Sequence, residues 1–278
     1  MNRILPLAAA LVLAVVIVMP GLARAEPVLT EATRGNDEWQ FGGLIYLYYA
    51  DVRTLATLPN GATSDVTIDA SDLLNNLQFT VMGSFEARKG QWGVFSDLIY
   101  LDVSKSKSQF HQLTLGNVGL PADASADVDF GLTSLVWTVA GTYRVVAKPE
   151  AVMDFIAGAR LLDTKVNLAY TLNGNVGPIP IPERTGNSEV KGHNVDGLVG
   201  LKGRVAFGSD LKWFVPYYGD VGTGDSELTW QIMSGLGYGL KWGEVIGGWR
   251  YVDYKFKSGS PIDSESFNGP VLGVAFHW

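Results

Sequence analysis

Charged side chains recur at alternate positions of otherwise apolar segments, and they are the residues with the widest scope for chemistry. Acids and bases are mixed among them, so they could form ion pairs or line a narrow path for ions. For Asp97 and Asp154 the pattern is less clean, because both faces of their segments hold apolar residues. The charged residues on the polar faces are Glu86, Arg88, Asp97, Arg144, Asp154, Arg160, Asp196, Lys202, Arg204, Lys212 and Arg250.

Histidine is the side chain best suited to general base chemistry near neutral pH, and the chain has His111, His193 and His277. His193 lies near Glu189 and Asp196 in the sequence, but a general base also needs geometric reach to its partner. The patterns GxSxG, HExxH and GxxxxGK[ST] are absent, and so is cysteine. The sequence therefore predicts no enzyme, cofactor or metal site. A lipid- or peptide-directed hydrolase using His111 or His193 is kept as an alternative.

The elements that must position these side chains are β-strands, because apolar and polar residues alternate with period two. In the segment 77–88, for example, Phe79, Val81 and Phe85 lie on one face, and Glu86 and Arg88 lie on the other. The same alternation predicts ten strands, at about 39–50, 75–88, 92–104, 128–146, 151–170, 195–207, 211–220, 227–240, 244–256 and 267–278. Eight or twelve strands are alternatives, because the segments around 151–170 and 211–226 could be split or merged.

Short turns and longer polar loops alternate strictly between these strands. The short turns lie at 89–91, 147–150, 208–210 and 241–243, and the other loops at about 51–74, 105–127, 173–194, 221–226 and 257–266. An antiparallel up-and-down sheet with short turns at one end and loops at the other produces this order. The predicted fold class is therefore all-β, a single antiparallel up-and-down β-barrel over 39–278.

Three features favour a membrane-spanning barrel over a soluble sandwich. Several predicted strands have 12 residues or more, whereas strands of soluble sheets average about five or six. Aromatic residues crowd the strand ends, as in the interfacial girdles of membrane barrels; Trp39, Trp92 and Trp213 are examples. The chain also ends inside an apolar strand, which would be an exposed edge unless it pairs with the first strand.

The first 25 residues have the pattern of a cleaved secretory signal peptide. A positive start and a long apolar run precede the A-x-A site Ala23–Ala25, and 26–38 then forms a short periplasmic N-terminal segment. Cleavage removes Arg3 and Arg24 and no acid, so the net charge of −7 becomes about −9. An acidic chain of this kind disfavours nucleic acid as a partner.

The signal peptide, the alternating strands and the final aromatic strand resemble bacterial outer-membrane β-barrel proteins. The terminal pattern consists of Leu272, Val274, Phe276 and Trp278. The resemblance implies an outer-membrane location, short turns in the periplasm and a last strand read by the barrel-assembly machinery. It does not assign the chain to a particular family. A single barrel of this kind is expected to be a monomer with outer-membrane lipid and lipopolysaccharide as its neighbours.

If the apolar faces touch lipid, the charged faces line a thin lumen. There they would form a structural salt-bridge plug, or a small-solute, porin-like pore with a bias toward anions. The residues expected to produce this bias are Arg144, Arg160, Lys202, Arg204 and Arg250. A further alternative is surface binding by the loop 173–194. Its alternating prolines at Gly177–Pro182 favour an extended, stiff conformation.

Overall fold

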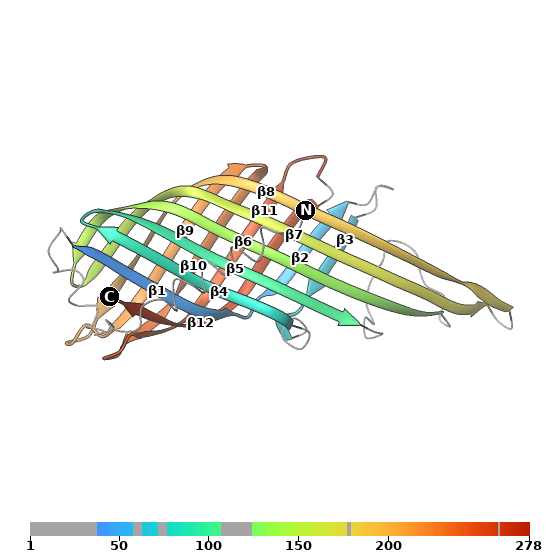
Figure 1. The fold of residues 1–278 in the computed structure, drawn as a ribbon, viewed down its shortest axis with the longest axis horizontal. Coiled ribbons are helices and arrows are strands. Elements are labelled where there is room, and N and C mark those ends of the chain that lie inside the picture. The colour runs from blue at the N-terminus through green and yellow to red at the C-terminus, as the bar shows by residue number, and fades with distance from the viewer. Residues whose placement is uncertain (1–37, 58–62, 72–76, 107–123, 177–178, 261) are drawn as a thin grey trace.

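Most described residues lie in long strands, as the period-two pattern predicts. The computed structural model describes residues 38–278 apart from 58–62, 72–76, 107–123, 177–178 and 261. The predicted signal peptide at 1–25, most of the segment 26–38 and His111 therefore lie outside the described residues. The strands are β1 (Trp39–Tyr48), β2 (Asp51–Thr57), β3 (Thr63–Ile68), β4 (Leu77–Lys89), β5 (Trp92–Ser106), β6 (Ala124–Lys148), β7 (Ala151–Val176), β8 (Ile179–Phe207), β9 (Trp213–Gly224), β10 (Ser226–Gly239), β11 (Glu244–Phe256) and β12 (Ser264–His277) (Figure 1).

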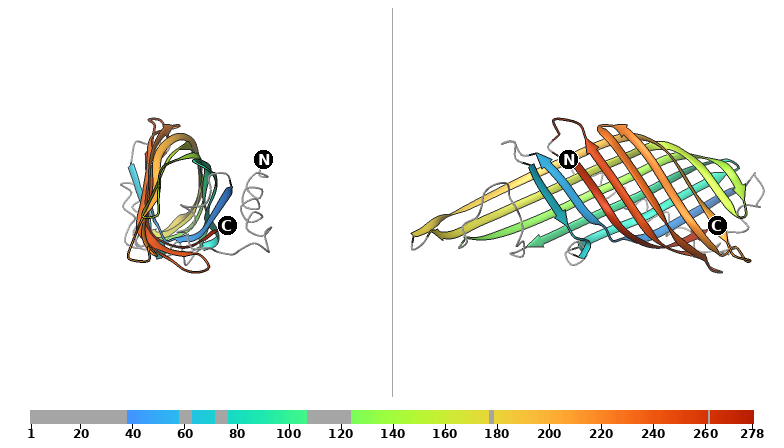
Figure 2. Two further views of the ribbon diagram at one scale, coloured as in Figure 1. Left: turned by 90° about the vertical axis from the view of Figure 1, so that its left-hand side faces the viewer. Right: turned by 180° about the vertical axis from the view of Figure 1, so that it is seen from behind.

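The sheet closes on itself because β1 pairs with both β4 and β12. Ile45, for example, pairs with Gly83 on one side and with Val274 on the other. From β4 to β12, each strand pairs with its sequence neighbour in antiparallel register. Figure 2 shows the strands as a closed ring in the end-on view. The predicted closed antiparallel β-barrel is confirmed.

Ten strands form the wall, as predicted. β2 continues the line of β1 and still pairs with β12, through Asp51 and Asn268. β3 pairs with β2, and no pairing with another strand occurs in the described part of the chain. The sequence predicts a loop at about 51–74, and the β2–β3 hairpin lies within that range. This segment therefore contains more regular secondary structure than its sequence indicates.

Three neighbouring strands are much longer than predicted. β6, β7 and β8 have 25, 26 and 29 residues, and they project beyond the rest of the barrel (Figure 1). The prediction of a loop at 173–194 is wrong for most of that segment, because β8 begins at Ile179. Its residues carry no continuous apolar face, and Pro180 and Pro182 disfavour a strand assignment. The hairpin therefore lacks the alternation by which strands are recognised.

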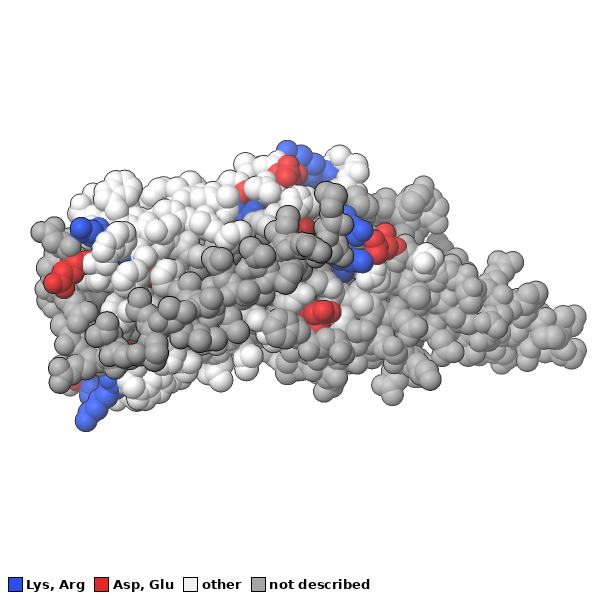
Figure 3. All heavy atoms as spheres, viewed as in Figure 1, with Lys and Arg blue, Asp and Glu red and all other residues white. Residues whose placement is uncertain are grey.

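The outer surface of the barrel carries a belt of exposed apolar side chains. It includes Leu47, Val139, Val199, Ile232 and Leu272, each between 38% and 63% exposed. Charged side chains gather toward the strand ends on the face in Figure 3. Cross-strand aromatic pairs flank the belt: the ring centroids of Trp213 and Tyr238 lie 4.7 Å apart near the short turns. At the other end, those of Trp230 and Tyr251 lie 4.9 Å apart. Among the described residues, no helix is long and apolar enough to cross a membrane.

The inward positions divide the interior into two halves. Toward the loops, a buried apolar cluster fills the barrel and includes Tyr48, Leu162, Tyr254 and Phe267. Ile262, from the connection between β11 and β12, joins this cluster with 4% exposure. Toward the short turns, charged and apolar side chains together line a cavity of about 230 Å³.

Candidate functional site

Ten of the eleven predicted charged residues lie on the inner wall, and Lys212 does not. Lys212 precedes β9, in the turn after β8, where its Nζ lies 3.1 Å from Asp210 and its side chain is 48% exposed. Gly208 and Leu211 have positive φ in this turn, so the chain leaves the line of the wall before Lys212. The hydrogen bond to Asp210 holds the pKa of Lys212 above its ordinary value.

Five of the charged residues form one network that ties together four of the five strands from β4 to β8. Arg144 grips Asp154 through two hydrogen bonds, from Nε to Oδ1 at 2.8 Å and from Nη2 to Oδ2 at 3.1 Å. Arg88 donates to the same carboxylate at 2.6 Å and also pairs with Glu86, which Lys202 contacts from the other side. Such charge-assisted, bidentate contacts fix the side chains of β4, β6, β7 and β8 relative to one another.

A second network crosses the lumen from β11 to β5. The Nη2 of Arg250 donates to Asp97 at 2.6 Å and to Gln231 at 2.9 Å, and its Nη1 donates to the hydroxyl of Tyr46 at 2.7 Å. Tyr46 in turn donates to the other oxygen of Asp97 at 2.8 Å. The pattern of charged residues does not single out Tyr46 or Gln231. Both occupy inward positions of their strands, so the alternation of inward and outward residues could have found them.

A third network lies beneath the apolar cluster and is sealed from solvent. Arg160 pairs with Asp220, and both side chains are 0% exposed. The guanidinium also donates to Thr138 at 3.1 Å and to Thr229 at 3.3 Å. The sequence prediction did not include Asp220 among the interior charges, because the predicted strand 211–220 ends at this residue. Asp196 lies apart and accepts the backbone N–H of Ser226 at 2.8 Å.

The mouth at the short turns holds a smaller cluster. Arg204 donates to Glu244 at 2.8 Å, and His277 Nε2 lies 3.3 Å from the other oxygen of that carboxylate. Exposure falls along the axis, from 24% for the side chain of His277 to 3% for Arg250 and 0% for Arg160. Solvent therefore reaches the interior from the short turns and is excluded at the level of Arg160.

The predicted terminal strand completes the wall with all four signature residues facing outward. Leu272 is 61% exposed, and Val274 pairs with both Ile45 and Val245. Trp278 exchanges backbone hydrogen bonds with Phe41, at 2.9 and 3.0 Å, and their rings stack. Trp278 is thus hydrogen-bonded to β1. The side chains of Phe276 and Trp278 lie on the outer face of the barrel, where β1 and β12 meet.

The structure does not bring His193 together with the acids near it in sequence. Its Nδ1 lies 3.2 Å from Asp163 on the outer face of the projecting sheet, where both side chains are exposed. Glu189 instead pairs with Lys165 and Lys191, and Asp196 faces the interior. Among the described residues, no group of three His, Asp or Glu side chains is placed to hold a metal ion.

No family model and no curated protein matches the chain. Solved structures similar to it include the outer membrane protease OmpT of Escherichia coli, at 8% identity over 86% of this chain and 96% of that chain, with a TM-score of 0.41. The translocator domain of the autotransporter NalP of Neisseria meningitidis matches at 14% identity over 90% of this chain and 91% of that chain, also at 0.41. The attachment invasion locus protein Ail of Yersinia pestis matches at 7% identity over 87% of this chain and 99% of that chain, with a TM-score of 0.36. At such identities and TM-scores, these likenesses say nothing about the activity of this chain.

Proposed function

We propose that this chain is an integral protein of the bacterial outer membrane whose barrel is closed to solutes. The observation that carries the proposal is the sealed layer made by the apolar cluster, which joins side chains from opposite parts of the wall, and the fully buried Arg160–Asp220 pair beside it. A solute would have to displace the cluster and pass this pair. Removing a partner from a buried ion pair costs about 3–5 kcal/mol. The interior charges then act as a structural plug, and the porin-like alternative has less support.

The exterior supports the membrane location. Exposed apolar side chains such as Leu47 and Ile232 would meet lipid, and the flanking aromatic pairs suit the headgroup level. A Lys or Arg facing mid-bilayer lipid would cost about 2–4 kcal/mol, so sequestering those charges inside the barrel is favourable.

Planar-bilayer recording of the purified protein tests the closed barrel. Flat current traces are expected for the wild-type chain. Regular conductance steps whose ion selectivity reverses on Arg160→Glu or Arg250→Glu would establish the pore instead. Lys255→Glu, on the exposed surface, is the matched control, because its side chain is 59% exposed and lies outside the lumen.

A second candidate function is binding at the cell surface by the projecting β6–β8 sheet. β8 pairs with β9 only from Asp196 onward, so 184–195 has no second strand beside it among the described residues. The backbone of Val195 still points toward the turn between β9 and β10, where Asp225 N–H donates to its oxygen and the Asp225 carboxylate accepts its N–H. By alternation, the backbone groups of His193, Lys191 and Glu189 point to the open edge. A free edge of this kind favours an extended polypeptide as the ligand.

Deletion of 173–192 tests this surface role. Binding to immobilised extended peptides, measured by surface plasmon resonance, is expected to disappear while the barrel still assembles. The finer test is Lys191→Pro, which removes an edge N–H and keeps the pairing with β7. Unchanged peptide binding by both variants would rule the edge out.

A further inference from the structure

The cavity of about 230 Å³ opens toward the short turns and ends inside the barrel. Arg204 and Glu244 lie at its mouth, and Arg250 with Asp97 lies at its inner end. Beyond that level the interior is filled by the Arg160 network and the apolar cluster. The cavity is therefore a blind pocket and has no role in a through-going path.

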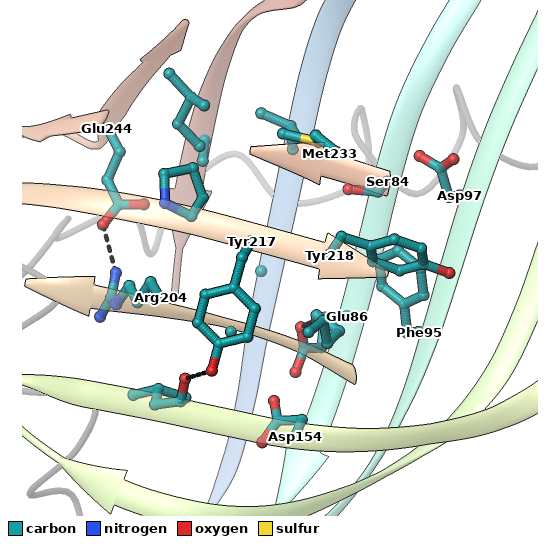
Figure 4. Close-up of a pocket in the computed structure, with 18 of the residues that line it drawn as sticks. Ser84, Glu86, Phe95, Asp97, Asp154, Arg204, Tyr217, Tyr218, Met233 and Glu244 are labelled. Atoms are coloured by element: carbon teal, nitrogen blue, oxygen red, sulfur yellow. Dashed lines mark hydrogen bonds and ion pairs between the residues drawn. The ribbon is translucent and has the colours of Figure 1, made fainter. Parts of the chain in front are cut away.

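Its two walls differ in chemistry. Strands β4 to β8 supply the charged wall, with Arg88, Arg144 and Lys202 and the carboxylates that hold them. The facing strands supply the apolar side chains Phe214, Met233 and Ile246, which pack in one cluster. Figure 4 shows Glu86 and Asp154 on one side of Tyr217 and Tyr218, and Met233 on the other. A ligand that satisfies both walls must be amphiphilic.

The charge of the lining favours an anion. Five Arg or Lys side chains and four Asp or Glu side chains line the cavity, which leaves one surplus positive charge. In a low-dielectric interior an uncompensated charge is costly, and a bound monoanion would neutralise it. Arg88 is 2% exposed, and its Nε and Nη1 have no hydrogen-bond partner among the described residues. These donors gain a partner if a carboxylate binds beside them.

The volume limits the size of the ligand. At about 30 Å³ per water molecule, the cavity holds the equivalent of roughly eight waters. This is below the roughly 300–1,000 Å³ of pockets that take drug-sized ligands. A carboxylate joined to one six-carbon ring or a short chain matches this space.

We propose that this pocket binds a small amphiphilic carboxylate that enters from the short-turn side. The carboxylate lies toward Arg88, Arg144 and Lys202, and the apolar body packs on Phe214, Met233 and Ile246. The barrel is then a binding protein for organic acids on that side of the membrane, and it remains closed to their passage. This binding role does not depend on the peptide binding proposed for the free edge of β8.

Three ring compounds that differ in charge test the proposal without any variant. Phenylacetate, 2-phenylethanol and 2-phenylethylamine are titrated by calorimetry into the folded full chain in lipid nanodiscs, with empty nanodiscs as the blank. Phenylacetate is expected to bind at one site, and the amine at least about tenfold more weakly, since charged hydrogen bonds are gained only with the anion. Absence of saturable phenylacetate binding, or equal affinity for the amine, would overturn it.

Two variants locate the site. Lys202→Met removes the surplus charge and should weaken phenylacetate at least about tenfold while leaving the alcohol almost unchanged. Lys255→Met is the matched control and should stay within about twofold, because Lys255 pairs with Glu227 on the surface. Ala275→Phe fills the pocket from its apolar wall and should abolish binding of both compounds. Binding of phenylacetate that survives both Lys202→Met and Ala275→Phe would refute the assignment of this pocket.

Discussion

The buried Arg160–Asp220 pair should be strongly coupled in the free energy of unfolding. Arg160→Met leaves the Asp220 carboxylate without its cation, and Asp220→Leu leaves the guanidinium with only Thr138 and Thr229 as acceptors. Each single change should cost about 3–5 kcal/mol, because a charge with 0% exposure cannot be rescued by water. The double variant Arg160→Met/Asp220→Leu should recover most of this loss, since two apolar side chains then replace the two charges.

The assay is urea unfolding of the protein folded into lipid vesicles, followed by tryptophan fluorescence. With a slope of about 3 kcal/mol per molar urea, each single variant should lower the midpoint by about 1–1.7 M. The exposed pair Lys255–Glu227, at 2.8 Å, is the control cycle and should give about 0–1 kcal/mol of coupling. If the losses for Arg160 and Asp220 simply add in the double variant, the pair is not energetically coupled and the structural plug is refuted.

Three further outcomes are expected. Gly237→Ala should destabilise the barrel by about 1–3 kcal/mol, because its Cβ would lie 2.2 Å from the ring of Phe214; Gly247→Ala, whose Cβ meets nothing within 4 Å, is the matched control in the same urea assay. Deleting 276–278 should reduce the folded barrel recovered from outer membranes severalfold, since Trp278 and Phe41 exchange both backbone hydrogen bonds; undiminished recovery would remove the assembly role. Asp163→Ala and His193→Ala should leave any lipid or peptide hydrolysis unchanged, because both side chains are exposed and His193 contacts neither Glu189 nor Asp196; loss of such an activity in either variant would reopen the enzyme hypothesis.

The sequence predicts the wall well because inward polar side chains and outward apolar side chains alternate strictly along its strands. In β4 the inward Glu86 and Arg88 and the outward apolar residues follow directly from period two. The same rule fails where the sequence has no apolar face, and it therefore predicts a loop for the part of β8 that begins at Ile179. Residues along its edge, such as Glu189 and Lys191, are polar and belong to no alternating apolar face by which a strand is recognised.

Partners within the interior are harder to predict than positions. Parity places Arg250 and Asp97 inside, but only the closed ring brings β11 opposite β5. The Arg160–Asp220 pair is hidden by sequence distance alone, since its members lie 60 residues apart on strands on either side of β8. The number of strands fixes the width across which such pairs meet, and alternation along one strand contains no such information.

The interior combines two requirements that a uniform core could not meet. Near the loops it is apolar and sealed, so side chains such as Leu162 and Tyr254 stabilise the closure as a soluble core does. Near the short turns it keeps partly exposed charges, and their desolvation cost is offset only in part by the ion pairs. Well-packed apolar residues could stabilise a plug as well as these ion pairs do. A charged, solvent-reachable half whose lining holds one more cation than anion is therefore the feature that the proposed anion would neutralise.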